Sequence, residues 1–249
     1  MAFALMVNQL IPALKQPGCP ICNLQRAAEE RFLAAFLQEN LMDQKARQKV
    51  LDSLGFCPAH TFQLAALELR SDGDTLGTNI LHEQLINRLQ QVLKGWRRKN
   101  SGGGGRSFFR GLNGGRQARL HPTEECPICA GMRDNNQRGL AALMDELGRN
   151  SQELMELVRQ GDGLCLAHLR QGLETLGGEY PAGADFLVAE ALNRLASQQE
   201  RMREFIRKHN LSYQDEVISA EEYRAWREAL SFFTGYAPDS FGPFNPRPD

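Results

Sequence analysis

Apolar residues recur at helical spacing along most of the chain. After Pro20 they fall at Leu24, Ala28, Phe32 and Phe36, which is the stripe of one helix face. The same reasoning, with proline and glycine as boundaries, predicts helices over residues 20–39, 43–54, 58–69, 76–99, 127–147, 151–159, 165–176 and 182–208. The residues used most often are Leu, Ala, Gln, Glu and Arg, which favour helices. We therefore expect an all-α protein with no β-sheet.

A further helix is expected near the C-terminus. Ser219 and Glu222 have the spacing of a capping box, and Gly235 provides a stop. The stripe Tyr223, Trp226, Leu230 and Phe233 is expected to pack that helix on the rest of the protein. Similar apolar seams, over residues 85–96 and 188–206 of the two longest helices, are expected to be buried.

Six cysteines and two histidines form a spacing pattern that occurs twice. Cys-Pro-Ile-Cys stands at residues 19–22 and 126–129, and a Cys-x-x-His pair follows each of them, at 57–60 and 165–168. The pattern uses every cysteine, and no secretory signal favours disulfides over reduced thiols. The cysteines are therefore candidate metal ligands.

Three thiolates and one imidazole are a typical donor set for structural zinc. We expect each half of the chain to close its own site, which gives two zinc ions per chain. The expected ligands are Cys19, Cys22, Cys57 and His60 in the first half, and Cys126, Cys129, Cys165 and His168 in the second. The alternatives are an iron–sulfur cluster on the same ligands, buried reduced cysteines and redox-active pairs.

The prolines explain how these short pairs are placed. Pro20, Pro58 and Pro127 each follow a cysteine and suit the first position of a helix. Residues three apart lie on one helix face, so both donors of a pair point the same way. Zinc with three thiolates carries a net charge near −1, which the positive ends of two helix dipoles favour. The sites are expected to be saturated, without a position for substrate.

The two halves also resemble each other between these motifs. Residues 55–60 (GFCPAH) correspond to 163–168 (GLCLAH), and the offset is 107 residues at the first pair and 108 at the second. We interpret this as two tandem repeats of about four helices each. With its CPxC and GLCxxH elements twice per chain, the sequence resembles an uncharacterised bacterial domain-of-unknown-function family of helical proteins, from about Cys19 to Gly235. The resemblance implies a helical fold and the metal ligands, and no activity.

Charge is distributed unevenly. The 249 residues carry a net charge of −1, but residues 84–123 contain no acidic residue. Seven basic residues of that segment are candidate contacts for nucleic acid or an acidic partner: Arg97, Arg98, Lys99, Arg106, Arg110, Arg116 and Arg119. The Gly-rich stretch within it is more typical of a flexible linker between the repeats.

These observations give the expected domains and function. The domains are a first zinc repeat (1–99), a flexible insertion (100–123), a second zinc repeat (124–209) and a C-terminal helix with a Pro-rich tail (210–249). No catalytic constellation is found, so we expect a non-enzymatic, zinc-stabilised interaction or regulatory protein of the cytoplasm. Its partner would be an unidentified protein, self-association is open, and no membrane contact is expected. A nucleic-acid-binding regulator and a zinc-thiolate redox sensor are the alternatives.

Overall fold

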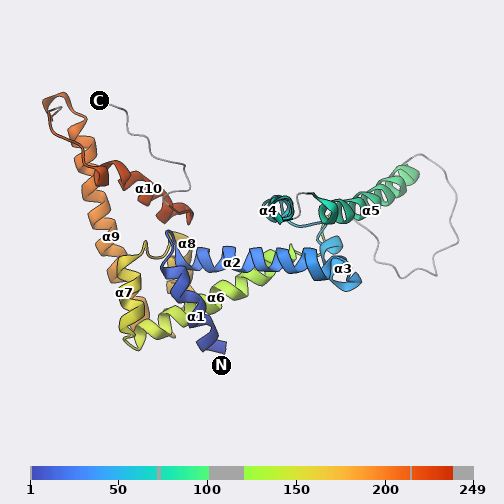
Figure 1. Ribbon diagram of the computed structural model, residues 1–249, viewed down its shortest axis with the longest axis horizontal. Coiled ribbons are helices and arrows are strands. Elements are labelled where there is room, and N and C mark those ends of the chain that lie inside the picture. The colour runs from blue at the N-terminus through green and yellow to red at the C-terminus, as the bar shows by residue number, and fades with distance from the viewer. Residues whose placement is uncertain (1, 72–73, 101–120, 214, 238–249) are drawn as a thin grey trace. The chain divides into compact units, whose positions relative to one another are not determined.

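The computed structural model describes residues 2–71, 74–100, 121–213 and 215–237. Within these ranges every regular element is a helix and no strand occurs (Figure 1). The α-helices are α1 (Ala2–Leu14), α2 (Pro20–Ala35), α3 (Gln44–Asp52), α4 (Pro58–Ser71), α5 (Leu76–Asn100), α6 (Pro127–Gly148), α7 (Gln152–Gln160), α8 (Leu166–Leu176), α9 (Pro181–Lys208) and α10 (Ala220–Thr234). A π-helical turn, Phe36–Asn40, continues α2, and a 3₁₀ turn, Leu211–Tyr213, follows α9.

Local sequence signals set most of these boundaries. The Asp43 carboxylate accepts a hydrogen bond from the Ala46 N–H (2.8 Å) and caps α3. Ser219 and Glu222 form the expected capping box of α10, and Gly235 ends that helix at φ +78°. The expected all-α class is confirmed. Helix α1 was not expected, and it forms because Leu10, Ala13 and Leu14 bury one of its faces.

The chain forms two compact units. Unit 1 comprises residues 1–27 and 133–249, and unit 2 comprises residues 28–132. The dividing points fall within α2 and α6, so each of these helices contributes residues to both units. Unit 1 thus takes residues from both of the sequence segments 1–99 and 124–209. The two-repeat arrangement remains a hypothesis, supported by the matching helix order α2–α5 and α6–α9.

Each unit has its own apolar core. In unit 1 the core joins α1, the start of α2, and α6 to α9, with Leu10, Leu140 and Leu143 fully buried. In unit 2 it joins the end of α2, α3, α4, α5 and the start of α6, and the Phe36 ring meets the Phe56 ring edge-on at 5.3 Å. Among the described helices, none is both long enough and apolar enough to cross a bilayer.

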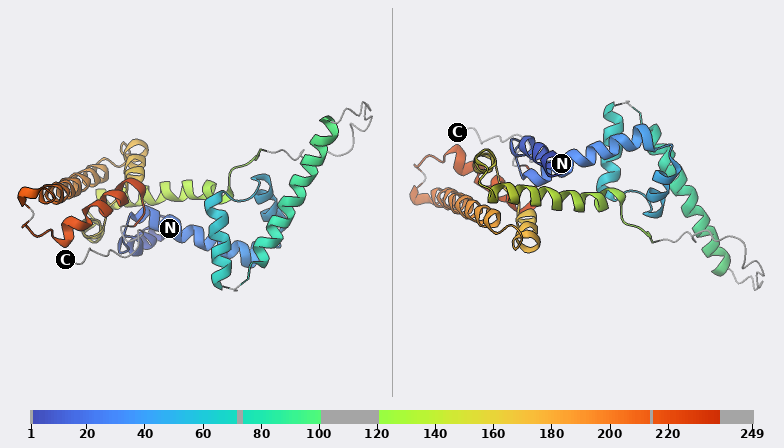
Figure 2. Two further views of the ribbon diagram at one scale, coloured as in Figure 1. Left: turned by 90° about the horizontal axis from the view of Figure 1, so that it is seen from above. Right: turned by 90° about the horizontal axis from the view of Figure 1, so that it is seen from below.

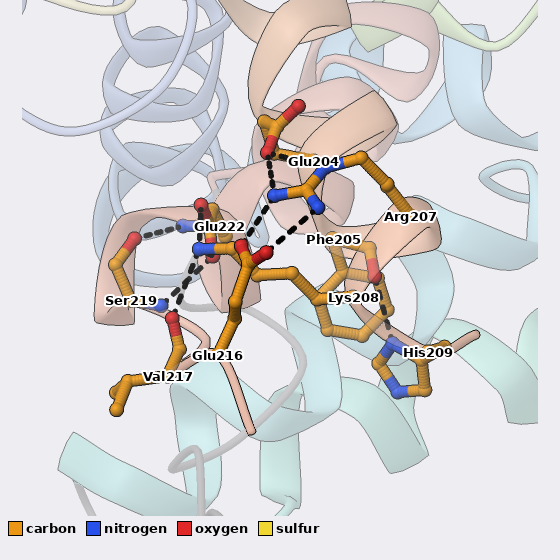
Figure 3. A network of polar contacts seen from close by, with 9 residues as sticks. All are labelled: Glu204, Phe205, Arg207, Lys208, His209, Glu216, Val217, Ser219 and Glu222. Atoms are coloured by element: carbon orange, nitrogen blue, oxygen red, sulfur yellow. Dashed lines mark hydrogen bonds and ion pairs between the residues drawn. The ribbon is translucent and has the colours of Figure 1, made fainter. Parts of the chain in front are cut away.

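Helix α10 lies along α9 within unit 1 (Figure 2). Charged groups at the end of α9 attach the N-terminal end of α10 (Figure 3): Arg207 pairs with Glu216 in the segment before α10, and Lys208 pairs with Glu222 of α10 at 2.8 Å. The Lys208 and Glu222 side chains are mostly buried, which limits screening of this pair by solvent. These contacts fix how α10 enters its position on α9.

Two expectations about apolar stripes are wrong. In α9 the buried positions are Gly183, Ala184, Leu187 and Gln198, whereas most of the seam expected over residues 188–206 is exposed. In α10 the inward face carries Ala225, Arg227 and Ser231, while the expected packing stripe leaves Trp226 at 40%, Leu230 at 37% and Phe233 at 63% exposure. The small Ala225 and Ser231 allow α10 to pack closely, so its larger apolar side chains project outward.

Candidate metal centres

All eight predicted ligands stand at the starts of helices. Cys19, Cys57, Cys126 and Cys165 directly precede α2, α4, α6 and α8, and the carbonyl of each accepts the first helical hydrogen bond at 2.8–3.0 Å. The second ligand of each pair follows three residues later, in the first helical turn. Helix geometry alone therefore points both donors of a pair to one side, as the spacing predicts.

The structure brings the eight side chains together in two groups of four. The unit 1 cluster contains Cys19, Cys22, Cys165 and His168; the unit 2 cluster contains Cys57, His60, Cys126 and Cys129. In each cluster the four donor atoms all lie within 4.8 Å of one another. The residues and the donor set agree with the sequence-based prediction, and the six cysteines form no disulfide.

The expected pairing within each half of the chain is wrong. Each Cys-Pro-Ile-Cys pair meets the Cys-x-x-His pair of the other half. The reason lies in the isoleucine between the two cysteines. Ile21 is buried in the core that contains α8, and Ile128 is buried in the core that contains α4, so each proline-started helix presents its thiols to the helix of the other half.

Donor distances within the clusters match a tetrahedral ion. Zinc bonds of about 2.3 Å to sulfur and about 2.0–2.1 Å to nitrogen place neighbouring donors about 3.5–3.8 Å apart. In unit 1 the Cys22 and Cys165 Sγ atoms are 3.8 Å apart, and the His168 Nδ1 lies 3.2–3.5 Å from the three sulfurs. In unit 2 the Cys57 and Cys129 Sγ atoms are 3.7 Å apart, and the His60 Nδ1 lies 3.1–3.5 Å from the sulfurs.

Backbone donors stabilise negative charge in the unit 2 cluster. Although burial opposes ionisation of Cys126, hydrogen bonds from the backbone N–H groups of Cys129, Cys57 and Ile128 lower the pKa of its thiol. These donors belong to the open N-terminal turns of α6 and α4, whose dipoles also favour an anion. Burial and the hydrogen bond with Cys57 raise the pKa of Cys129 to about 12. Without a metal ion, Cys126 would thus lose its proton more readily than Cys129.

The unit 1 cluster shows the same behaviour. Hydrogen bonds from Cys19 and Cys22 lower the pKa of the Cys165 thiol, and the corresponding bonds raise the pKa of Cys22. Burial opposes protonation of His168, but hydrogen bonds with Cys165 and Cys19 raise its pKa to about 9. A metal ion entering either cluster would replace these shared protons, which links loading to pH.

Each histidine has a partner on its second ring nitrogen. The His60 Nε2 lies 3.2 Å from the Glu29 carboxylate, and both side chains are less than a tenth exposed. The His168 Nε2 lies 3.3 Å from the Asn136 amide, which also contacts Gln25 at 2.7 Å. Such outer partners orient a metal-bound imidazole and fix its proton on Nε2. Rotating the Asn136 amide would let its Oδ1, which is buried without a hydrogen bond, accept that proton.

Sequence reasoning missed these two partners, although a signal was present. Glu29 and Asn136 each stand seven residues after the second cysteine of a Cys-Pro-Ile-Cys pair, at the same offset of 107 residues that relates the pairs. Seven residues are two helical turns, so the polar group lies on the same helix face as the ligands. Each helix therefore supplies ligands to one cluster and the outer partner to the other.

Coverage differs between the clusters. In unit 1 the C-terminal end of α10 closes over the thiols: a Cβ atom built on Gly235 would lie 2.8 Å from the Cys22 Sγ and 3.4 Å from the Cys165 Sγ. A cavity of about 370 Å³ beside this cluster is lined by residues of α9, α10 and the loop before α8. Its charged side chains are engaged with each other or with the backbone, as in the Arg201–Glu228 pair at 2.6 Å. In unit 1 only Cys22 is partly exposed, whereas in unit 2 both Cys57 and Cys129 are.

The basic candidates fall mainly outside the described side chains. Arg97, Arg98 and Lys99 lie in α5, but their side chains are not described. Arg106, Arg110, Arg116 and Arg119 lie outside the described residues. Of the described basic residues in this segment, Arg88 pairs with the buried Asp52 at 3.1 Å and so has a structural role. Binding of nucleic acid or an acidic partner stays a prediction.

The fold and the two clusters define an all-α protein with two centres of three cysteines and one histidine, each able to hold a metal ion. The chain belongs to the family of unknown function DUF6062, whose model matches residues 6–239. It is also similar to the "Uncharacterized 23.9 kDa protein in xynA 3'region" of Caldicellulosiruptor sp. (strain Rt8B.4). The two are 23% identical over 232 residues, which cover 91% of this chain and 99% of the relative. No solved structure matches the chain significantly.

Proposed function

We propose that each cluster holds one structural zinc ion and that the protein is a non-enzymatic interaction or regulatory protein that these ions keep in shape. The observation that carries the proposal is that four donor atoms lie within 4.8 Å of one another in each of the two clusters. The donor–donor distances given above are those expected around a tetrahedral ion. A cubic iron–sulfur cluster would hold the cysteine and histidine donor atoms farther apart, because its iron and sulfide atoms lie between them. The donor distances therefore favour a single ion in each cluster.

A structural role follows from the number of ligands. Four protein donors saturate tetrahedral zinc, whereas catalytic zinc keeps a position for water or substrate. The ligands also join helices from both halves of the chain, so each ion would cross-link segments far apart in sequence. Cys22 and Cys165, for example, are 143 residues apart. Structural zinc in small peptides contributes about 10–16 kcal/mol to folding, of which a chain with two apolar cores needs only part.

Metal analysis of the gently purified chain tests the zinc proposal. We expect close to two zinc equivalents, and cobalt substitution should give the absorption of tetrahedral thiolate-bound cobalt. Cys57→Ser should lose one equivalent and keep the ion bound by the unit 1 cluster. A chain that is fully helical and cooperatively folded with no metal would contradict the proposal.

The interaction role is supported by the exposed stripe of α10, formed by Trp226, Leu230 and Phe233. Contiguous exposed apolar side chains on a rigid helix are typical of binding surfaces. We expect Phe233→Ala to lose partners that the wild-type chain captures, with zinc content unchanged. Leu211→Ala is the control, because Leu211 is 83% exposed outside the stripe. Equal capture by both variants would argue against this surface.

A further inference from the structure

The two clusters share a donor set but differ in which thiols solvent can reach. In unit 1, Cys19 and Cys165 are 2–3% exposed, and Cys22 is partly exposed with the end of α10 lying against it. In unit 2, Cys57 and Cys129 are both partly exposed, and the described part of this unit contains no counterpart of α10. A small oxidant can therefore reach two neighbouring thiolates in unit 2, whereas in unit 1 only Cys22 is partly exposed and both of its partner thiols are buried.

The exposed pair is also arranged to react with itself. The Cys57 Sγ lies 3.7 Å from the Cys129 Sγ, and the two residues start different helices, α4 and α6. A rotation of either side chain would shorten this separation toward the S–S bond length of about 2.05 Å. The third thiol, Cys126, is only 8% exposed, so an oxidant reaches it less readily than the two partly exposed thiols.

We propose that Cys57 and Cys129 form an oxidation site: a peroxide joins the two metal-bound thiolates in a disulfide, which releases the ion of the unit 2 cluster and leaves the ion of unit 1 in place. This inference rests on the proposed metal binding and adds to it a regulated site and a class of co-reactant. It deepens the structural role, because only one of the two cross-links becomes removable.

The chemistry balances with hydrogen peroxide as the oxidant. One thiolate attacks a peroxide oxygen; an S–O bond forms, the O–O bond breaks and hydroxide leaves. The second thiolate attacks the resulting sulfenic acid; the S–S bond forms, the S–O bond breaks and a second hydroxide leaves. Two sulfur atoms each lose one electron, and the peroxide gains both. The ion then keeps only Cys126 and His60 as protein ligands in this cluster, which is too few to hold it against a chelator.

The experiment uses the full chain and begins with its metal content. Zinc is measured before any oxidant is added, so a metal-free chain would count against the proposed function and not against the oxidation step. Hydrogen peroxide is then titrated in the presence of a chromophoric chelator. We expect one zinc equivalent to appear for about one equivalent of peroxide consumed, while the second is retained until the oxidant is in large excess.

Peptide mapping without reductant identifies the bond that forms. We expect a Cys57–Cys129 linkage, and a reductant together with zinc should restore two bound equivalents. A Cys126–Cys129 linkage, a linkage in unit 1, or simultaneous release of both ions would each overturn the proposal. Retention of both ions at excess peroxide would also overturn it.

A truncated chain tests why unit 1 resists. Removing residues 219–249 takes α10 away from Cys22, whose Sγ lies 3.8 Å from that of Cys165. If cover by α10 is the cause, both ions of the truncated chain should be released at similar peroxide concentrations, with helicity and initial zinc content as checks of folding. Should the truncated chain not fold, the full chain's release curve and peptide map still decide the proposal.

Discussion

Replacing Glu29 by glutamine should weaken zinc binding by the unit 2 cluster and leave the unit 1 cluster unchanged. With the His60 Nδ1 on the ion, Nε2 carries the ring proton and donates it to the carboxylate 3.2 Å away. Both side chains are less than a tenth exposed, so water screens this bond little. The substitution keeps the shape of the side chain and an acceptor oxygen but removes the charge.

The expected magnitude follows from the class of hydrogen bond. A bond to a charged group contributes about 1.5–3 kcal/mol, against about 0.5–1.5 kcal/mol for a neutral pair. The loss of about 1.4 kcal/mol corresponds to about a tenfold lower affinity. Glu29→Ala removes the acceptor as well and should fall within the 10- to 100-fold range found for outer ligand partners.

Competition with a chromophoric chelator measures the affinities, and NMR of the cadmium-substituted chain separates the two ions by chemical shift. Glu30→Gln is the matched control, because Glu30 is the next residue on α2 and pairs with Arg70 on the surface. The reciprocal variant Asn136→Asp places a carboxylate beside His168 and should strengthen the unit 1 cluster alone. If Glu29→Gln shifts both ions equally, or if Glu30→Gln has the same effect, the outer-partner argument is wrong.

Three further predictions test the ligand pairing and the attachment of α10. Residues 1–100 alone should bind no zinc with four protein ligands, because they hold half of each cluster. Mixing them with residues 121–249 should restore two zinc equivalents. One tightly bound zinc ion in either piece would refute the pairing between halves of the chain. Ser219→Ala should cost about 0.5–2 kcal/mol and speed hydrogen exchange in α10, while Glu221→Ala, outside the capping box, should not. Hydrogen bonds from Lys208 and the Ser219 backbone lower the pKa of Glu222. The stability that ionised Glu222 contributes to the folded state is therefore complete above the unfolded-state pKa of about 4.3, and it is lost as pH falls through the lower folded-state pKa. Trp226 fluorescence should report this acid release of α10, and the same acid transition in Glu222→Gln would contradict it.

Local features of the sequence were sufficient to identify the ligands. A cysteine followed by proline starts a helix, and the next donor three residues later must share its face, whatever surrounds the helix. Caps such as Asp43 and Ser219 act through the nearest backbone N–H groups, so their effect was also predictable. For the same reason the helix boundaries from residue 20 onward agree closely with the structure.

Only tertiary packing decided which Cys-Pro-Ile-Cys pair shares a cluster with which Cys-x-x-His pair. The two Cys-Pro-Ile-Cys pairs are identical, and each Cys-x-x-His pair fits either of them, so spacing cannot distinguish pairing within a half from pairing between halves. The choice depends on which core buries Ile21 and which buries Ile128. The partners of His60 and His168 follow from the same packing, since Glu29 and Asn136 reach them only across that arrangement. Helix amphipathicity likewise did not indicate that α10 turns Ala225 and Ser231 inward, because close approach to α9 selects small side chains over large apolar ones.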